Sequence, residues 1–190
     1  MFISTRPAPF PLVSGTDLMT SAAASSNLSE SSIRRDIIAT AQDLNRRGFC
    51  PSKSGNVSAR WQDGFLITPS GVPYDDLMPD HLVFMTAAGM PAPSIREGLR
   101  PSSEWRFHHA LYQNQSEAQA IVHTHSPMAT ALSCTRKSIP AFHYMIALAG
   151  GADIRCADYA TFGSEELAQH MLAAFEGRKA VLLANHGVVT

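Results

Sequence analysis

Three histidines stand where they could bind one metal ion. His123 and His125 follow the apolar stretch 120–122, and side chains two positions apart on a strand point to the same face. His186 closely follows a second apolar stretch, 180–184. Either motif alone is more typical of a structural histidine, but three histidines with an open fourth position are typical of a catalytic zinc site. The sequence therefore predicts a metal site made of these three side chains.

Glu104 is the residue that we predict as a general base beside this metal. It follows Pro101, Ser102 and Ser103 at the start of a predicted helix, where proline and hydroxyl residues are favoured. In the first turn of that helix, free backbone N–H groups and the helix dipole would favour its ionised form. The alternative interpretation is that Glu104 only complements the dipole.

Several turns of the chain offer neutral hydrogen-bond donors to an anion. Two serines bring hydroxyls and free amides to the start of the same helix, as in phosphate sites at helix N-termini. The turns at 55–56 and 70–71 have similar chemistry. Each alone would be only a turn, but together they predict a phosphate cradle. Its candidate residues are Asn56, Ser70, Gly71, Ser102 and Ser103.

The other histidines and the cysteines show no comparable pattern. We interpret four histidines as structural or solvent-facing: His81, His108, His109 and His170. His143 adjoins Tyr144 and has no assignment from its pattern alone. The three cysteines are widely spaced and lack metal-ligand spacing. They predict reduced thiols of a cytoplasmic protein rather than a disulfide framework.

The composition of the 190 residues indicates a globular domain. Lys and Arg number 15 and Asp and Glu number 16, so the formal net charge is −1. Because such a chain has no excess of positive charge, nucleic-acid binding through phosphate contacts is not expected. Hydrophobic residues make up 45%, which is too many for a disordered chain. No run of about 18 apolar residues occurs, so no membrane span is expected.

Residues 1–31 differ from the rest, and we expect the folded domain to span 32–190. The leading segment is rich in Ser, Ala, Thr and Pro and has no period that would bury one face. It fits a secretory signal poorly, because Arg6 is its only early cation and prolines interrupt its apolar part. We expect a disordered leader, or a start assigned too early, with Met19 as the alternative start.

Periodicity, caps and turn signals predict an α/β domain with a mixed or largely antiparallel sheet. The first helix would end before Gly48, and Asp63-Gly64 would form the turn of a hairpin. The predicted helices are 32–47, 101–112, 128–134, 144–149 and 164–175. The predicted strands are 56–61, 65–68, 82–85, 120–125, a short one near 139, 154–156, 180–184 and 188–190.

Five motifs, in this order along the chain, resemble those of the class II aldolase/adducin family. They are SGNVS at 54–58, ITPSG at 67–71, PSSE at 101–104, VHTH at 122–125 and NHG at 185–187. Two more, IPAFHY at 139–144 and YATFG at 159–163, are similar to motifs of the ketose-1-phosphate aldolases in that family. The resemblance spans about residues 33–190.

The resemblance implies a three-layer α/β/α fold and a metal-dependent aldolase. In such enzymes three histidines hold Zn²⁺ or another divalent metal, and a glutamate contacts the metal and acts as base. These residues map onto His123, His125, His186 and Glu104. The phosphate pocket maps onto Asn56, Ser70, Gly71, Ser102 and Ser103. Tyr144 matches a proton donor from the neighbouring subunit of a homotetramer, and Phe162 matches a residue on the aldehyde side.

The implied reaction is reversible cleavage of a ketose 1-phosphate to dihydroxyacetone phosphate and a short aldehyde, through a metal-stabilised enediolate. Pentulose-phosphate 4-epimerases, sugar-acid phosphate decarboxylases and a dehydratase of the same family keep the metal site and are the alternatives. The epimerases tend to carry Asp in place of Glu104 and to lack the pair His143-Tyr144. A non-catalytic adducin-head-like module would lack the metal ligands, which are all present here.

Two features depart from the family pattern. Lys53 stands where a small hydroxyl residue is expected, although a lysine could itself bind an anion. The chain ends at Thr190, shortly after His186, whereas family members continue through further helices. We therefore expect a C-terminally truncated form in which the strand 188–190 has nothing to cover it.

Overall fold

The computed structural model describes residues 29–93 and 96–190. Most of the predicted leader, residues 1–28, therefore lies outside the described residues. Helix α1 spans Glu30–Arg46 and begins slightly before the predicted residue 32. The reason is its cap: the hydroxyl of Ser29 accepts a hydrogen bond from the backbone N–H of Ser32 at 3.2 Å.

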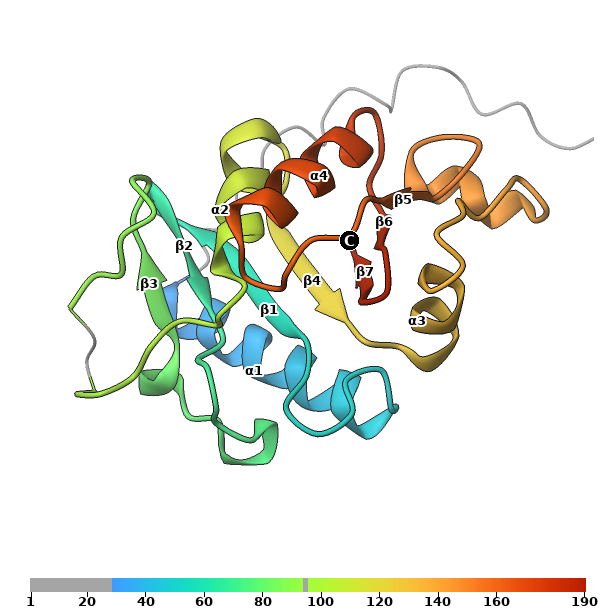
Figure 1. The fold of residues 1–190 in the computed structure, drawn as a ribbon. Coiled ribbons are helices and arrows are strands. Elements are labelled where there is room, and N and C mark those ends of the chain that lie inside the picture. The colour runs from blue at the N-terminus through green and yellow to red at the C-terminus, as the bar shows by residue number, and fades with distance from the viewer. Residues whose placement is uncertain (1–28, 94–95) are drawn as a thin grey trace, which may run out of the picture.

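A seven-stranded sheet forms the centre of the described part of the chain (Figure 1). Its order is β3-β2-β1-β4-β7-β6-β5, and every neighbouring pair is antiparallel except β5 and β6. This confirms the predicted mixed, largely antiparallel sheet. The strands are β1 Asn56–Trp61, β2 Gly64–Ile67, β3 Val83–Met85, β4 Ala120–Thr124, β5 Arg155–Ala157, β6 Val181–Leu183 and β7 Gly187–Val189.

Helices cover both faces of this sheet, as the three-layer prediction requires (Figure 1). On one face α1 packs its isoleucines against Val57 and Leu66. On the other, α2 (Trp105–Asn114) and α4 (Glu165–Phe175) pack over Phe65 and Ile67. Alternate residues of β2 thus enter opposite cores. The remaining helical elements are α3 Pro127–Ser133 and the 3₁₀ turns η1 Tyr74–Asp76, η2 Pro79–His81 and η3 Tyr144–Ala149.

The predicted hairpin of β1 and β2 forms, but its turn differs from the prediction. Trp61 pairs with Gly64, so Gln62 and Asp63 make the loop, and Gln62 takes the positive φ of 50°. Gly64 is needed for a different reason. A Cβ at this position would lie 2.0 Å from the carbonyl oxygen of Met85 on β3, so only glycine allows the two strands to approach this closely.

Strand β7 corrects the expectation that 188–190 lacks cover. It lies between β4 and β6 near the middle of the sheet, and Val189 is fully buried in the core beneath α2 and α4. None of the helices in the described ranges is both long and apolar enough to cross a membrane.

Candidate metal centre

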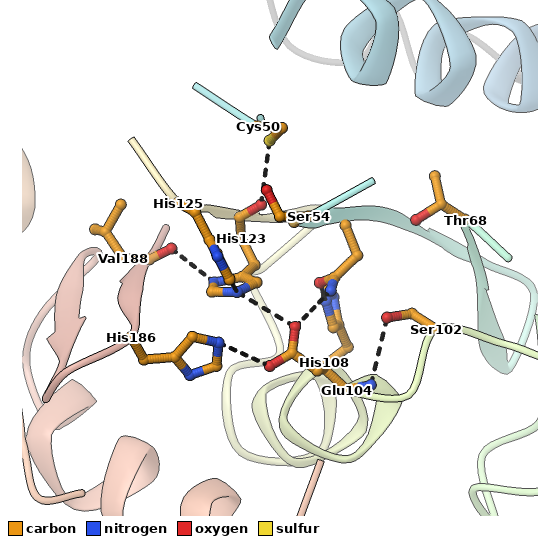
Figure 2. A network of polar contacts seen from close by, with 12 residues as sticks. Cys50, Ser54, Thr68, Ser102, Glu104, His108, His123, His125, His186 and Val188 are labelled. Carbon is orange, nitrogen blue, oxygen red and sulfur yellow. Dashed lines mark hydrogen bonds and ion pairs between the residues drawn. The ribbon is translucent and has the colours of Figure 1, made fainter. Parts of the chain in front are cut away.

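Four side chains that are distant in the sequence converge at one end of the central strands. Glu104, His123, His125 and His186 each offer a ligand atom, and these atoms all lie within 4.8 Å of one another (Figure 2). His123 lies on β4 and His125 directly follows it. His186 immediately precedes β7, the neighbour of β4, and Glu104 immediately precedes α2. The sheet order therefore brings all four together.

The three imidazoles are arranged around one point. Their ring centroids are 4.8–4.9 Å apart pairwise, and the Nε2 atoms of His123 and His125 are 2.9 Å apart. The Nδ1–H of His123 donates to the carbonyl oxygen of Val188 at 3.0 Å (Figure 2). This bond directs the lone pair of Nε2 into the cluster, which is how metal-binding histidines are commonly oriented.

The side chain of Glu104 contacts this cluster and does not cap α2. It occupies the N-cap position of α2 rather than the predicted first turn, and its side chain makes no capping hydrogen bond. Its backbone N–H donates to the hydroxyl of Ser102 at 3.3 Å. Its carboxylate oxygens lie 3.3 Å from Nε2 of His123 and 3.1 Å from Nε2 of His186. The turn before α2 thus directs the carboxylate toward the sheet.

The electrostatics of the cluster favour a divalent cation. Burial alone would raise the pKa of Glu104, but the charges and hydrogen bonds of His123 and His186 hold it well below its usual range. Burial and the neighbouring imidazoles lower the pKa of His125 to about 4, which leaves it neutral. Within the described structure, Oε1 of Glu104 is buried, and its polar neighbour is Nε2 of His186 at 3.1 Å. A buried carboxylate beside three imidazoles is a donor set that fits a zinc-like ion.

A turn in the loop before β7 places His186. The turn is made by Asn185, which takes a φ of 55°, and not by Gly187. Glycine is needed at 187 because a Cβ there would lie 2.4 Å from the carbonyl oxygen of Thr124. Because Gly187 has no Cβ, β7 can lie directly against β4, and His186 thereby approaches His123.

A cavity of about 370 Å³ opens beside the cluster and contains the predicted phosphate residues. Its lining includes Glu104, His125 and His186 together with Asn56, Ser70, Gly71, Ser102, Ser103 and Phe162. The Asn56 side chain is not free, because it is hydrogen-bonded to Glu104 and His108. Lys53 also lines the cavity, where its Nζ donates to the carbonyl oxygen of Gly71 at 3.3 Å.

Tyr144 does not line this cavity. It begins η3, its ring stacks on that of His143, and its side chain is 81% exposed. Phe142 beside it is 74% exposed. Within one chain, therefore, the described structure does not bring Tyr144 to Glu104.

Sequence reasoning missed the role of His108, which is fully buried and linked to Glu104 through Asn56. A signal was present, because Glu104, His108 and Tyr112 are spaced four apart and share one side of α2.

Of the other histidines interpreted as structural or solvent-facing, His81 is buried and contacts Arg96, and His109 and His170 are partly exposed. The three cysteines are all free.

Comparisons with known proteins show what this chain is similar to. The family model described as "Class II Aldolase and Adducin N-terminal domain" matches residues 35–190. L-fuculose phosphate aldolase of Escherichia coli (strain K12) is 50% identical over 157 residues, covering 83% of this chain and 71% of that protein. The 5-methylthioribulose-1-phosphate/5-deoxyribulose-1-phosphate aldolase of Rhodospirillum rubrum is 48% identical over 83% of this chain and 69% of its own.

The comparison with solved structures gives the same result. A structure of L-fuculose 1-phosphate aldolase superposes with a TM-score of 0.80 at 38% sequence identity. The match covers 87% of this chain and 77% of that chain.

Proposed function

Because the chain belongs to the class II aldolase and adducin family and is a class II aldolase, we propose that it is zinc-dependent and reversibly cleaves a ketose 1-phosphate. The products would be dihydroxyacetone phosphate and a short aldehyde, with L-fuculose 1-phosphate as the model substrate. The observation that carries this proposal is the convergence of Glu104 and three histidines beside a cavity. The lining of this cavity includes uncharged groups that can donate hydrogen bonds to an anion.

His123, His125, His186 and Glu104 would hold the metal. A bound divalent ion would supply Lewis-acid stabilisation of the negative charge that develops when a bond beside a carbonyl breaks. Three imidazoles with one carboxylate suit zinc better than magnesium or calcium, which prefer oxygen ligands. His123 is held in its binding tautomer by Val188.

Glu104 would transfer the proton at the carbon atom of the three-carbon product. Its Oε1 has no hydrogen bond within the described structure, while Oε2 accepts one from Asn56 at 2.9 Å. The oxygen that would accept the proton is therefore Oε1, whose polar neighbour is Nε2 of His186 at 3.1 Å. No lysine is required, because the metal takes the place of a Schiff base as the electron sink.

The phosphate of the substrate would bind at the other wall of the cavity. Ser70, Ser102 and Ser103 offer hydroxyls there, and Gly71 and Ser103 offer backbone amides. The backbone amides of Ser70 and Ser102 already donate to the carbonyl oxygens of Arg100 and Thr68. Phe162 offers an apolar surface for the aldehyde side of the substrate.

Tyr144 would complete the site from a neighbouring subunit, as proton donor to the aldehyde oxygen in condensation. Its high exposure, with that of Phe142, supports an intersubunit role. We therefore propose a homotetramer with sites shared between subunits. A cytoplasmic location is part of the proposal and is supported by the three free cysteines.

The test is a cleavage assay across a panel of ketose 1-phosphates, with metal analysis of the purified protein. We expect release of dihydroxyacetone phosphate and close to one equivalent of zinc per chain. Less than a few tenths of an equivalent of any divalent metal would overturn the metal assignment. Interconversion of pentulose phosphates without a three-carbon product would replace the aldolase proposal by an epimerase.

A further inference from the structure

A buried chain of hydrogen bonds extends from Glu104 away from the cavity into the core. Oε2 of Glu104 accepts from Nδ2 of Asn56 at 2.9 Å, and Oδ1 of Asn56 is hydrogen-bonded to Nε2 of His108. Nδ1 of His108 is 2.7 Å from the hydroxyl of Ser58, which is 2.8 Å from that of Tyr112. All five residues are buried. We call them the Glu104 network.

The secondary structure presents these side chains to one another. Asn56 and Ser58 lie two apart on β1 and face α2, while Glu104, His108 and Tyr112 repeat every four residues along the facing side of that helix. Two strand residues thus alternate with three helix residues. The network requires this register of α2 over β1.

The donors and acceptors in the Glu104 network have only one consistent direction. The ionised Glu104 can only accept, so the amide nitrogen of Asn56 faces it and the amide oxygen faces His108. His108 must then carry its proton on Nε2. Burial lowers the pKa of His108 to about 3, so Nδ1 keeps its lone pair and accepts from Ser58. The Ser58 oxygen in turn accepts from Tyr112, and every hydrogen bond donates toward the carboxylate.

This arrangement gives the two oxygens of Glu104 different surroundings. Oε2 is held by Asn56, while Oε1 has no hydrogen bond in the described structure and lies 3.1 Å from Nε2 of His186. If the amide of Asn56 were reversed, its oxygen would face the carboxylate and the two would repel. The carboxylate of Glu104 therefore disfavours that reversal from one side, and His108, as a donor at Nε2 to the amide oxygen, disfavours it from the other.

We propose that His108 is a positioning residue: it fixes the amide orientation of Asn56, which holds Oε2 of Glu104 and keeps Oε1 directed at the metal and the substrate. The consequence for catalysis rests on the proposed function above. The direction of the hydrogen bonds in the Glu104 network does not rest on the proposed function, and it can be measured without substrate or metal.

The first test is the tautomer of His108 in metal-free protein labelled with ¹⁵N in its histidines. Long-range ¹H–¹⁵N correlation spectra distinguish the two ring nitrogens. We expect a neutral imidazole protonated at Nε2 at neutral pH. A ring protonated at Nδ1, or at both nitrogens, would overturn the proposal.

The second test uses variants of His108 and measures zinc affinity against a chelator, together with kcat and KM. His108→Leu removes the donor to Asn56, so we expect zinc affinity or kcat to fall about 10- to 100-fold, with KM changed less than kcat. His108→Gln places an amide N–H near the position of Nε2 and should restore most of the loss. His109→Gln is the matched control, because His109 is adjacent on α2 and, in the described part of the chain, its ring nitrogen Nε2 is hydrogen-bonded to the carbonyl oxygen of Ala87 and not to the Glu104 network.

If His108 had only a structural role, His108→Leu would lower the stability of the protein without the loss of zinc affinity or kcat that His108→Gln restores. If His108→Leu does not fold, Ser58→Ala replaces it, since it removes the donor to Nδ1 and leaves His108 in place. Wild-type zinc affinity and kcat in the folded variant would overturn the proposal. If the wild-type protein cleaves no ketose 1-phosphate, the proposed function fails, whereas the tautomer and the zinc affinities still decide the role of His108.

Discussion

In the proposed function Glu104 is both a metal ligand and the base, and one substitution separates these two roles. Glu104→Gln keeps an oxygen for Asn56 but cannot accept a proton. Three histidines remain to hold the metal, so we expect zinc to be retained while proton exchange on dihydroxyacetone phosphate falls about 10²–10⁴-fold. Exchange is measured by NMR in deuterated water, with the exposed Glu117→Gln as control. Unchanged exchange in Glu104→Gln would remove Glu104 as the base.

Lys53 places a positive charge in a cavity wall that otherwise offers neutral donors. Lys53→Ser should raise KM for a ketose 1-phosphate about 3- to 10-fold, with little change in kcat, because the charge attracts the phosphate and not the reacting carbon. The difference should shrink at high salt. Lys137→Ser removes the same charge from an exposed position outside the cavity and should leave KM unchanged. Equal effects in both variants would contradict a specific role for Lys53.

The candidate site was predictable where residue type and spacing carry the chemistry, and not where partners come from other elements. His123, His125, His186 and Glu104 stand out in the sequence, and the structure brings them together. His108 was placed among the structural histidines, because its partners Asn56 and Ser58 lie about fifty residues away on β1. A buried histidine can be identified as part of a site only when those partners are known.

At the scale of the elements, the contact of β7 with β4 sets the position of His186. Gly187→Ala would put a Cβ 2.4 Å from the carbonyl oxygen of Thr124, so the strands must separate. We expect a loss of about 1–3 kcal/mol in the free energy of unfolding and about tenfold weaker zinc binding. Thermal unfolding and chelator competition measure the two effects.

Gly64→Ala is the matched control for that variant. It creates the same kind of clash, 2.0 Å from the carbonyl oxygen of Met85, but at the hairpin end of β1, where Trp61 pairs with Gly64. The metal centre lies at the other end of β1, beside Asn56. Stability should fall in both variants, and zinc affinity only in Gly187→Ala. Equal zinc affinity in the two would contradict a link between the β4–β7 contact and the metal centre.

The elements themselves were predicted well where local signals act alone. The helix predicted over 164–175 forms as α4 and is capped by Ser164 through a hydrogen bond from the N–H of Leu167 at 3.1 Å, and α1 ends before Gly48. Gly64 was interpreted as a turn residue, but it is needed, as Gly187 is, for the close approach of another strand. That distinction depends on the sheet order, which no local pattern contains.

At the scale of the whole molecule, the metal centre and Tyr144 lie on different parts of one chain. The cavity opens where β1, the end of β4 and the loop before β7 meet, whereas η3 begins with the exposed Tyr144, close to the exposed Phe142. Exposed aromatic side chains of this size are typical of contact surfaces. A site shared between subunits would account for both observations.

Complementation between two inactive variants tests this sharing. Glu104→Gln and Tyr144→Phe should each lose most cleavage activity. In a ring where each site combines Glu104 of one chain with Tyr144 of the next, an equal mixture should regain about a quarter of the wild-type sites, since half of the chains carry each intact residue. Wild-type chains mixed equally with the double variant should also give about a quarter. If both residues acted within one chain, the first mixture would stay inactive and the second would keep about half.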